Sequence, residues 1–165
     1  MSDPVRAAYA AGLAMLARRE LSEARIRERL RRKEHDAAAI DAAVVRLREA
    51  GAVDDRRVAR SAARTETHVR SRGRGYVLRK LQALGIAPDT AAEAVDEVFS
   101  TLDESALLTR ALSRRLRGPS AAIRDQAHFR RLYQQLVRQG FQPSAVLAVL
   151  KARAKAGNVP DDDAP

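Results

Sequence analysis

One spacing of apolar residues occurs three times along the chain, and this repeat limits the possible folds more than any other feature. The copies are anchored at Leu30, Leu81 and Leu136, and the compared positions lie four before and five, ten and fourteen after each anchor. With the anchors, 14 of the 15 positions are apolar, whereas the 45% apolar content of the chain would place about seven there. His35 is the exception, and we expect it to be a half-buried structural residue. This pattern predicts tandem helical units.

The turns between helices repeat in the same way. A short turn follows each anchor, and a residue suited to a helix start comes next: Asp36, Pro88 or Pro143. Ser22 and Asp36 fit N-caps, because their side-chain oxygens can accept hydrogen bonds from first-turn amides. Proline suits the first turn of a helix, where its missing N–H has no partner to lose. We therefore predict an all-α fold of three tandem three-helix repeats in an elongated, curved array.

The repeat boundaries follow from these turns. We place the three repeats at 4–52, 54–99 and 101–156, followed by an acidic tail, 157–165, that we expect to be disordered. Asp54 or Asp55 caps the first helix of the second repeat, and a capping-box pattern from Thr101 to Glu104 opens the third. The span Arg117–Ser120 is expected to break the third repeat, with helices from Ala121 to Gln139 and from Pro143 to Lys155 after it.

Composition narrows the class of protein further. Only 4% of the residues are aromatic, so the core is expected to consist mainly of Leu, Val, Ile and Ala, which favours helices over sheets. The absence of Cys excludes disulfides, thiol catalysis and thiolate metal sites. No apolar run reaches the roughly 18 residues that span a bilayer, and no basic leader with an apolar run opens the chain. We expect a cytoplasmic monomer without membrane contact.

The net charge of +10 is unevenly distributed. Residues 56–80 contain nine Lys or Arg and one acid, Glu66, and residues 105–157 carry a further +10, whereas 1–55 sum to only +1 and 86–104 to −6. A strongly basic face favours a polyanion or an acidic protein surface as the partner. Arg outnumbers Lys by 27 to 4, which genome base composition and ordinary solvated helix faces also explain, so both interpretations stay open.

The basic stretch is predicted to form a helix, a glycine hinge and a second helix. Its core-facing residues are expected at helical spacing: Val58, Ala62, Ala63 and Val69 before the hinge, and Val77, Leu78, Leu81 and Leu84 after it. The hinge Arg72–Gly75 is more typical of a turn than of a phosphate-binding loop, because it lacks the P-loop pattern. We expect Tyr76 to pack on its own repeat rather than to stack on a base.

The candidate contact residues are the cations of this stretch and of the third repeat. Three lie on one helical stripe, five surround the hinge and three form a second stripe: Arg57, Arg60 and Arg64; Arg70, Arg72, Arg74, Arg79 and Lys80; Arg110, Arg114 and Arg117. A guanidinium group pairs with a carboxylate or a phosphate through two parallel hydrogen bonds. These residues therefore form the predicted partner-binding surface.

An enzyme is not indicated. The three histidines, His35, His68 and His128, lie in different repeats without a metal-ligand spacing, and we predict neither a metal nor another cofactor. Four acids of one helix, Asp89, Glu93, Asp96 and Glu97, follow helical spacing and are more typical of a solvated stripe, or of one that pairs with a basic face. No set of nucleophile, base and orienting group is present in the pattern.

Four segments together resemble the RecX family, regulators of the bacterial recombinase RecA. They are LARRELSEARIRERL (16–30), RLREAGAVDDRRVA (46–59), RSRGRGYVLRKLQALGI (70–86) and LVRQGFQPSAVLAVL (136–150), and the resemblance covers about residues 8–154. Two positions depart from the family pattern. Glu34 stands where the family tends to have glycine, so this helix must end without an easy left-handed residue, and Val58 stands where the family tends to have an aromatic residue.

The resemblance implies a non-enzymatic modulator. Such proteins are expected to lie in the helical groove of the RecA filament on single-stranded DNA and to inhibit its ATPase, strand-exchange and coprotease activities in recombination, DNA repair and the SOS response. An array with one basic face is compatible with this, because several weak contacts on connected units reinforce one another. Changing Arg57, Arg60 and Arg64 together to Ala is expected to preserve helical content and to weaken inhibition.

Two other functions stay open on the residues alone. Paired helices with Arg on one face also describe a helix-turn-helix DNA-binding module, in contact with single- or double-stranded DNA. Against it, the stretch from Arg60 to Lys80 contains no Asn or Gln for base readout. A scaffold repeat without a nucleic-acid partner is the other alternative. A steep salt dependence of duplex binding, without an effect on recombinase, would favour the DNA module.

Overall fold

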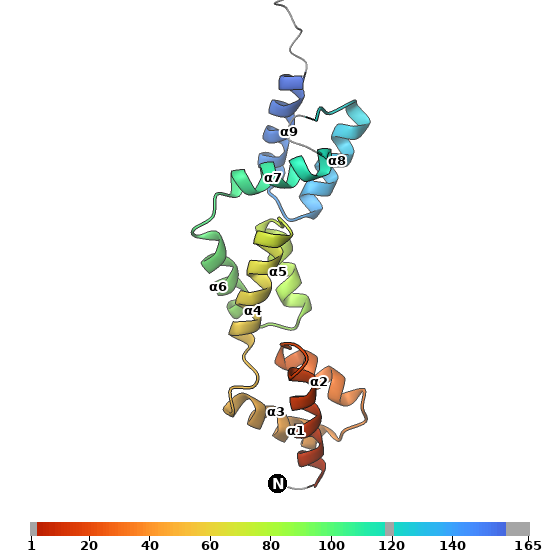
Figure 1. The fold of residues 1–165 in the computed structure, drawn as a ribbon, viewed down its shortest axis with the longest axis vertical. Coiled ribbons are helices and arrows are strands. Elements are labelled where there is room, and N and C mark those ends of the chain that lie inside the picture. Colours follow the sequence, from red (N-terminus) through yellow and green to blue (C-terminus); the bar gives the residue numbers. More distant parts are fainter. Residues whose placement is uncertain (1–2, 118–120, 158–165) are drawn as a thin grey trace, which may run out of the picture. The chain divides into compact units, whose positions relative to one another are not determined.

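Figure 1 shows the computed structural model of the chain, which describes residues 3–117 and 121–157. Every regular element among these residues is helical, which confirms the predicted all-α fold. The elements are α1 (Asp3–Leu16), α2 (Glu23–Arg31), α3 (Ala37–Glu49), α4 (Asp55–Arg64), a π-helix (Thr65–Val69), α5 (Arg74–Ala83), α6 (Pro88–Phe99), α7 (Glu104–Leu116), α8 (Gln126–Arg138) and α9 (Pro143–Gly157). Residues 118–120 of the predicted break and 158–165 of the predicted tail lie outside the described residues.

The repeated apolar positions form the core, as predicted. All fourteen are between 0% and 6% exposed, and His35, the polar exception, is half-buried. Burying each large side chain stabilises the fold by about 1.5–3 kcal/mol. The sequence repeat is therefore a repeat of core positions.

Helices α2, α5 and α8 also end in the same backbone geometry. The amide five residues after each anchor leucine donates to the leucine carbonyl oxygen: His35 to Leu30 at 3.3 Å, Ile86 to Leu81 at 3.2 Å and Phe141 to Leu136 at 3.3 Å. The preceding residue has a positive φ in each case, 62° at Glu34, 78° at Gly85 and 89° at Gly140. These features define a Schellman motif, in which a left-handed residue closes the helix. Glu34 thus adopts the left-handed conformation that glycine takes in the other two copies.

Several helix starts confirm the predicted caps, and two correct the prediction. Ser22, Asp36 and Asp54 each accept a hydrogen bond from an amide of the following turn. The capping box expected at Thr101 is wrong, because Asp103 caps α7 and accepts from Ser105 and Ala106 at 2.8 and 3.0 Å. The helix expected from Ala121 begins only at Gln126, because the Asp125 side chain accepts from the His128 amide at 2.6 Å and caps it there.

The predicted helix before the glycine hinge is correct up to Arg64, after which it widens into a π-helix. One extra residue per turn rotates the following side chains, so Val69, predicted to face the core, is 64% exposed. Glu66 and Thr67 are instead buried, at 4% and 0% exposure. The core-facing prediction is therefore wrong at Val69, and a carboxylate occupies the interior.

The chain divides into two compact units. Unit 1 comprises residues 1–63 and 78–96, and unit 2 comprises residues 64–77 and 97–165. In unit 1, α1, α2 and α3 pack on one another around Leu30, Val44 and Leu47. In unit 2, α7, α8 and α9 pack on one another. The boundary runs through the helices of the second predicted repeat, and the division at 4–52, 54–99 and 101–156 stays a prediction.

The turn after α5 is anchored to the first helices within unit 1. The Ser22 hydroxyl, which also caps α2, donates to the carbonyl oxygen of Leu84 at 2.5 Å. The Arg25 guanidinium donates to the carbonyl oxygen of Ala83 at 2.8 Å. These bonds satisfy two of the carbonyl groups that the end of a helix leaves without partners.

Candidate partner-binding surface

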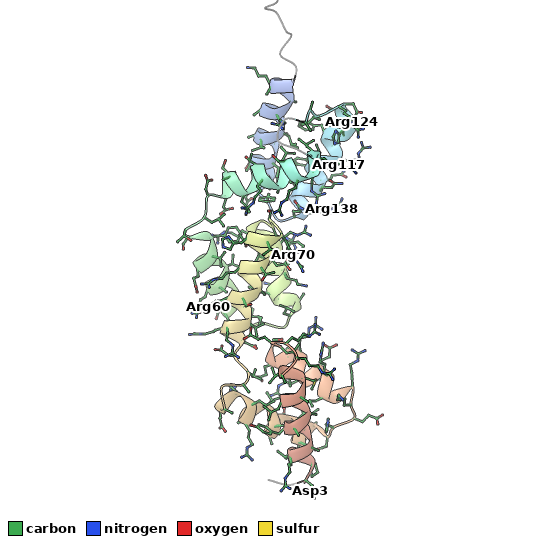
Figure 2. All side chains as sticks on the ribbon, in the orientation of Figure 1. Asp3, Arg60, Arg70, Arg117, Arg124 and Arg138 are labelled. Atoms are coloured by element: carbon green, nitrogen blue, oxygen red, sulfur yellow. The ribbon has the colours of Figure 1, made fainter. Side chains whose placement is uncertain are left out.

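The eleven predicted contact residues are divided between the two units. Four of them, Arg57, Arg60, Arg79 and Lys80, belong to unit 1. The other seven belong to unit 2: Arg64, Arg70, Arg72, Arg74, Arg110, Arg114 and Arg117. Figure 2 draws the side chains and labels Arg60, Arg70 and Arg117, all of which are exposed.

In unit 1, the cations of α4 lie beside carboxylates. The Arg57 Nε atom donates to Glu20 at 2.5 Å, and its Nη1 atom lies 3.9 Å from Asp54. Arg56 lies 3.7 Å from Glu93 of α6. Arg60 and Arg79 are exposed, and Lys80 is half-buried. Part of the positive charge of α4 is therefore neutralised within the unit.

Three predicted contact residues of unit 2 gather around the segment 66–71. Arg70 pairs with the buried carboxylate of Glu66 at 2.9 Å. Arg110 donates to the hydroxyl of Ser71 at 3.2 Å, and Arg114 donates to the carbonyl oxygen of Val69 at 2.9 Å. The π-helix and α7 thus hold three guanidinium groups around one short segment. Arg117 ends α7 in a left-handed conformation, with a φ of 63°.

The glycine hinge is a close backbone contact within unit 2. The Gly73 amide donates to the carbonyl oxygen of Gln139 at 2.8 Å, and the Gly75 amide donates to that of Gly140 at 3.1 Å. A Cβ atom on Gly73 would lie 2.6 Å from the backbone of Gly140, so only glycine fits. Because these amides already have acceptors, they do not converge on an anion. The predicted turn is shorter than expected, since Arg74 and Gly75 already belong to the first turn of α5.

The arginines beside the hinge are held by aromatic rings. The guanidinium carbon of Arg72 lies 4.6 Å from the centre of the Tyr76 ring, and that of Arg74 lies 5.1 Å from the centre of the Phe99 ring. Such contacts between a cation and a ring fix the direction of the guanidinium group. The Tyr76 ring lies against Arg72 of its own predicted repeat, and the Tyr76 backbone also lies beside Gly140 of the third one. Arg74 also lies 3.7 Å from Glu104.

Sequence reasoning missed Arg115, which reaches from α7 to α8. Arg115 donates to the Gln135 amide oxygen at 2.8 Å. With the Gln139 amide turned so that its oxygen faces the donors, it accepts from Arg115 at 2.6 Å and from Arg72 at 3.2 Å. Burial lowers the pKa of Arg115, and the charges of Arg72 and Arg138 lower it further.

A signal for Arg115 was present in the sequence. Leu108, Ala111 and Leu112 are buried, and Arg115 follows them at the spacing that continues the same helix face. The sequence analysis instead counted the exposed stripe of Arg110 and Arg114. Helical spacing alone therefore separates the half-buried arginine of α7 from the exposed ones.

The described residues show no metal-binding cluster. Among residues 3–117 and 121–157, no three His, Cys, Asp or Glu side chains are placed to hold a metal ion. The predicted acidic stripe of α6 pairs with α4 instead, since Glu93 lies 3.7 Å from Arg56 in unit 1 and Glu97 lies 3.4 Å from Arg64 in unit 2. In the same part of the chain, no helix is long and apolar enough to cross a bilayer.

Comparison with known proteins supports the same fold. A family model described as "RecX, first three-helix domain" matches residues 8–47. A solved structure described as "Crystal structure of RecX from Lactobacillus salivarius" is 18% identical, with a TM-score of 0.75, and covers 92% of this chain and 99% of that one. Another, "Crystal structure of regulatory protein RecX", is 22% identical, with a TM-score of 0.74, and covers 91% of this chain and 72% of that one.

Sequence relatives give closer matches. A protein of Syntrophotalea carbinolica described as "Regulatory protein RecX" is 33% identical over 143 residues, which cover 85% of this chain and 91% of the relative. A protein of Geobacillus kaustophilus with the same description is 31% identical over 149 residues. That match covers 90% of this chain but only 55% of the relative, so the chain spans about half of the length of that protein.

Fold and comparisons together define an all-helical repeat protein with an arginine-rich surface. The chain belongs to the RecX family of regulatory proteins. The resemblance predicted from the four sequence segments is thereby confirmed.

Proposed function

We propose that this chain regulates RecA by binding its filament on single-stranded DNA and inhibiting ATP hydrolysis, strand exchange and coprotease activity. It acts as a cytoplasmic monomer, without catalysis of its own, in recombination, DNA repair and the SOS response. The proposal rests on the chain's membership of a family described as regulatory and on the resemblance that links this family to RecA.

The gathering of Arg70, Arg110 and Arg114 around one segment of unit 2 supports the proposal most directly. Guanidinium groups fixed by hydrogen bonds and ion pairs lose less freedom on binding than mobile ones do. Several of them on one surface attract an anionic partner and increase the rate of association. A nucleoprotein filament offers both carboxylates and phosphates as acceptors.

Direct binding to nucleic acid is the second candidate, because the net charge is +10. The structure makes it the weaker one. Arg57 and Arg64 lie within 4 Å of carboxylates, so part of their charge is already neutralised and would contribute less to phosphate binding.

The test is an ATPase titration. Protein at less than one copy per RecA is expected to slow ATP hydrolysis on single-stranded DNA, at concentrations where its own affinity for that DNA is negligible. A steep salt dependence of duplex binding combined with unchanged RecA turnover would support the DNA module instead. If neither assay shows an effect, the remaining interpretation is a scaffold repeat without a nucleic-acid partner.

A further inference from the structure

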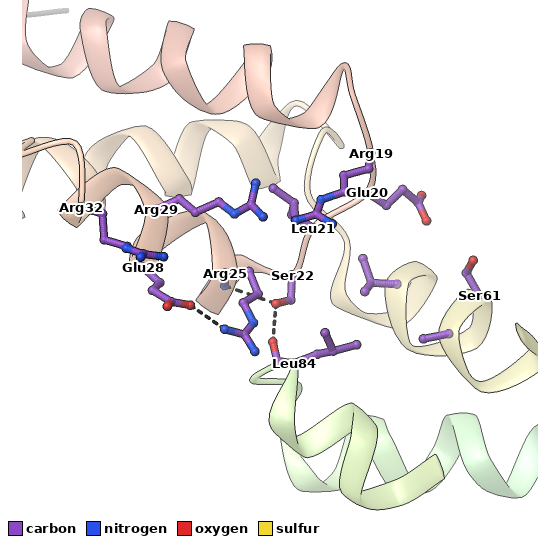
Figure 3. Close-up of a pocket in the computed structure, with 12 residues that line it drawn as sticks. Arg19, Glu20, Leu21, Ser22, Arg25, Glu28, Arg29, Arg32, Ser61 and Leu84 are labelled. Carbon is purple, nitrogen blue, oxygen red and sulfur yellow. Dashed lines mark hydrogen bonds and ion pairs between the residues drawn. The ribbon is translucent and has the colours of Figure 1, made fainter. Parts of the chain in front are cut away.

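A second basic surface lies on unit 1, and none of the eleven residues considered above lines it. Two hollows open side by side along α2 and the end of α1, with volumes of about 440 and 640 Å³. They share three lining residues, Arg19, Arg29 and Arg32. Figure 3 shows the first hollow, with these arginines on one side and Ser22 and Leu84 on the other.

Positive charge dominates both hollows. The larger one is lined by Arg18, Arg19, Arg29, Arg32 and Lys33 and by no acid. None of these five side chains forms an ion pair or side-chain hydrogen bond within the described residues. A surface of this kind attracts anionic groups and offers them donors that have no competing acceptor.

The two acids of the smaller hollow are already engaged. Glu20 accepts from Arg57 at 2.5 Å, and Glu28 accepts from Arg25 at 2.7 Å. That hydrogen bond and the nearby arginines lower the pKa of Glu28, which keeps its carboxylate ionised beside Arg25. Arg19, Arg29 and Arg32 therefore keep their donors available to an external partner.

Helix geometry explains why the linear charge count missed this surface. Residues 1–55 sum to only +1, but α2 separates its charges by face. Arg25, Arg29 and Arg32 follow i, i+4 and i+7 spacing on one side, whereas Arg27 on another side pairs with Glu23 at 3.0 Å. Glu23 thus neutralises Arg27 on the other side. Glu28 pairs with Arg25 on this side, but Arg29 and Arg32 remain, so the face stays basic.

Apolar side chains also line both hollows, and none of them is aromatic. Leu21, Val58, Ala62 and Leu84 line the smaller hollow, and Ala11, Ala14 and Met15 line the larger one. Binding of single-stranded nucleic acid draws on aromatic side chains on which the bases stack, and none is present here. A hollow lined by both guanidinium groups and aliphatic side chains instead complements a peptide that presents carboxylates on one side and aliphatic side chains on the other.

We propose that this surface binds an acidic amphipathic segment of a protein partner. Aliphatic side chains of the segment enter the two hollows, and its carboxylates pair with Arg19, Arg29 and Arg32. Proteins commonly bind an amphipathic helix by taking its apolar face into a groove, with apolar anchor residues three or four positions apart. This inference goes beyond the proposed regulation of RecA and stands on separate residues, so each can fail without the other.

The test uses the full chain and a labelled synthetic peptide of about 14 residues with Glu on one helical face and Leu on the other. Fluorescence anisotropy measures its binding to the unaltered chain and to the triple variant Arg19→Gln, Arg29→Gln and Arg32→Gln. The triple variant is expected to bind about tenfold more weakly or worse, because three charge-assisted pairs are lost. A matched variant, Arg6→Gln, Arg31→Gln and Arg46→Gln, removes the same charge at exposed positions outside the hollows and is expected to change affinity less than about twofold.

Two further readouts keep the test independent of variant folding. NMR shift changes on the unaltered chain are expected at residues 11–33, 58–62 and 84, and a peptide with Gln in place of Glu is expected to lose binding. Equal weakening in both triple variants, or shift changes elsewhere, would overturn the proposal. Binding of an oligothymidylate of equal charge in place of the peptide, or binding of neither, would overturn it too.

Discussion

The backbone amide of Gly73 donates a hydrogen bond of 2.8 Å to the carbonyl oxygen of Gln139, which joins the start of α5 to the turn between α8 and α9. The carbonyl oxygen of Gly140 forms the second hydrogen bond of this contact, which it accepts from the Gly75 amide. A Cβ atom on Gly140 would lie 2.0 Å from the Tyr76 nitrogen, and the φ of 89° favours glycine in any case.

Gly140→Ala is therefore expected to destabilise the protein by about 2–4 kcal/mol, the sum of left-handed strain and overpacking. The matched change is Gly51→Ala, since Gly51 has a φ of 67° but nothing within 4 Å of its Cβ position. In that variant only the left-handed strain applies, so its free energy of unfolding is expected to fall by about 1 kcal/mol. Urea unfolding followed by circular dichroism measures both. Equal losses would show that the contact with Tyr76 contributes nothing.

Glu34→Gly is expected to stabilise the protein by about 1 kcal/mol. Glu34 is exposed and has a φ of 62°, the conformation that glycine takes at Gly85 and Gly140. Glycine removes the steric cost of this conformation, partly offset by its greater freedom in the unfolded chain. Glu34→Ala retains the Cβ atom and is expected to leave stability unchanged. A rise in thermal midpoint for the glycine variant alone would bear out this account, and a fall would contradict it.

Asp55 links the stability of unit 1 to pH. Its carboxylate accepts from the Glu23 amide at 2.8 Å, but burial raises its pKa above 3.8, with smaller contributions from Glu23 and Asp54. The folded state therefore binds this proton more tightly than the unfolded state. The corresponding stability is fully present below the unfolded pKa and is lost as pH rises through the folded pKa.

Asp55→Asn keeps an oxygen acceptor for the Glu23 amide and removes this titration. Relative to the unaltered chain, the variant is expected to gain stability as pH rises from the unfolded pKa of this carboxyl group through its raised folded pKa. Thermal unfolding at a series of pH values measures the difference. A difference that is independent of pH would show that the burial of Asp55 has no energetic effect.

Arg70 has a structural role that precedes any contact with a partner. It is the counter-ion of Glu66, whose side chain is only 5% exposed. Arg70→Ala leaves this carboxylate without a charged partner and is expected to cost about 1–3 kcal/mol. Adding Glu66→Gln removes the buried charge. The loss of stability in the double variant is therefore expected to be smaller than the sum of the losses in the two single variants. Strictly additive losses would show that the two side chains do not interact.

The core was predictable from sequence because its pattern is local. Helical spacing placed Ile26, Leu30 and Val44 inside, and the same spacing recurs in the later repeats. Val69 was misplaced because a π-helix adds one residue to the turn, and nothing in the spacing of Thr65, Glu66 and Thr67 indicates it.

The candidate surface was predictable only in part. The sequence identified the basic residues but not their partners. Arg114 donates to the Val69 carbonyl group and Arg57 to Glu20, and only the fold brings these groups together. The basic hollows of unit 1 were missed because acids that are adjacent in sequence, such as Glu23, lie on another face of α2. Net charge along the chain averages over faces that the helix separates.

The change of Arg57, Arg60 and Arg64 together to Ala tests the α4 surface. The ion pairs of Arg57 and Arg64 are exposed, and such pairs contribute at most about 1 kcal/mol each, so the helical content is expected to stay unchanged. Inhibition of RecA is expected to weaken by about tenfold. The triple variant of Arg6, Arg31 and Arg46 to Ala removes equal charge and serves as the control. Equal inhibition by both variants would show that these α4 residues are not contacts.

The most direct measurement of the proposed function is ATP turnover by RecA on single-stranded DNA, titrated with the unaltered chain. The account predicts that turnover falls at less than one copy of this protein per RecA, and that the fall persists at salt concentrations that abolish its binding to free DNA. Turnover that stays constant up to excess protein, or that falls only in proportion to DNA occupied by this protein, would contradict it.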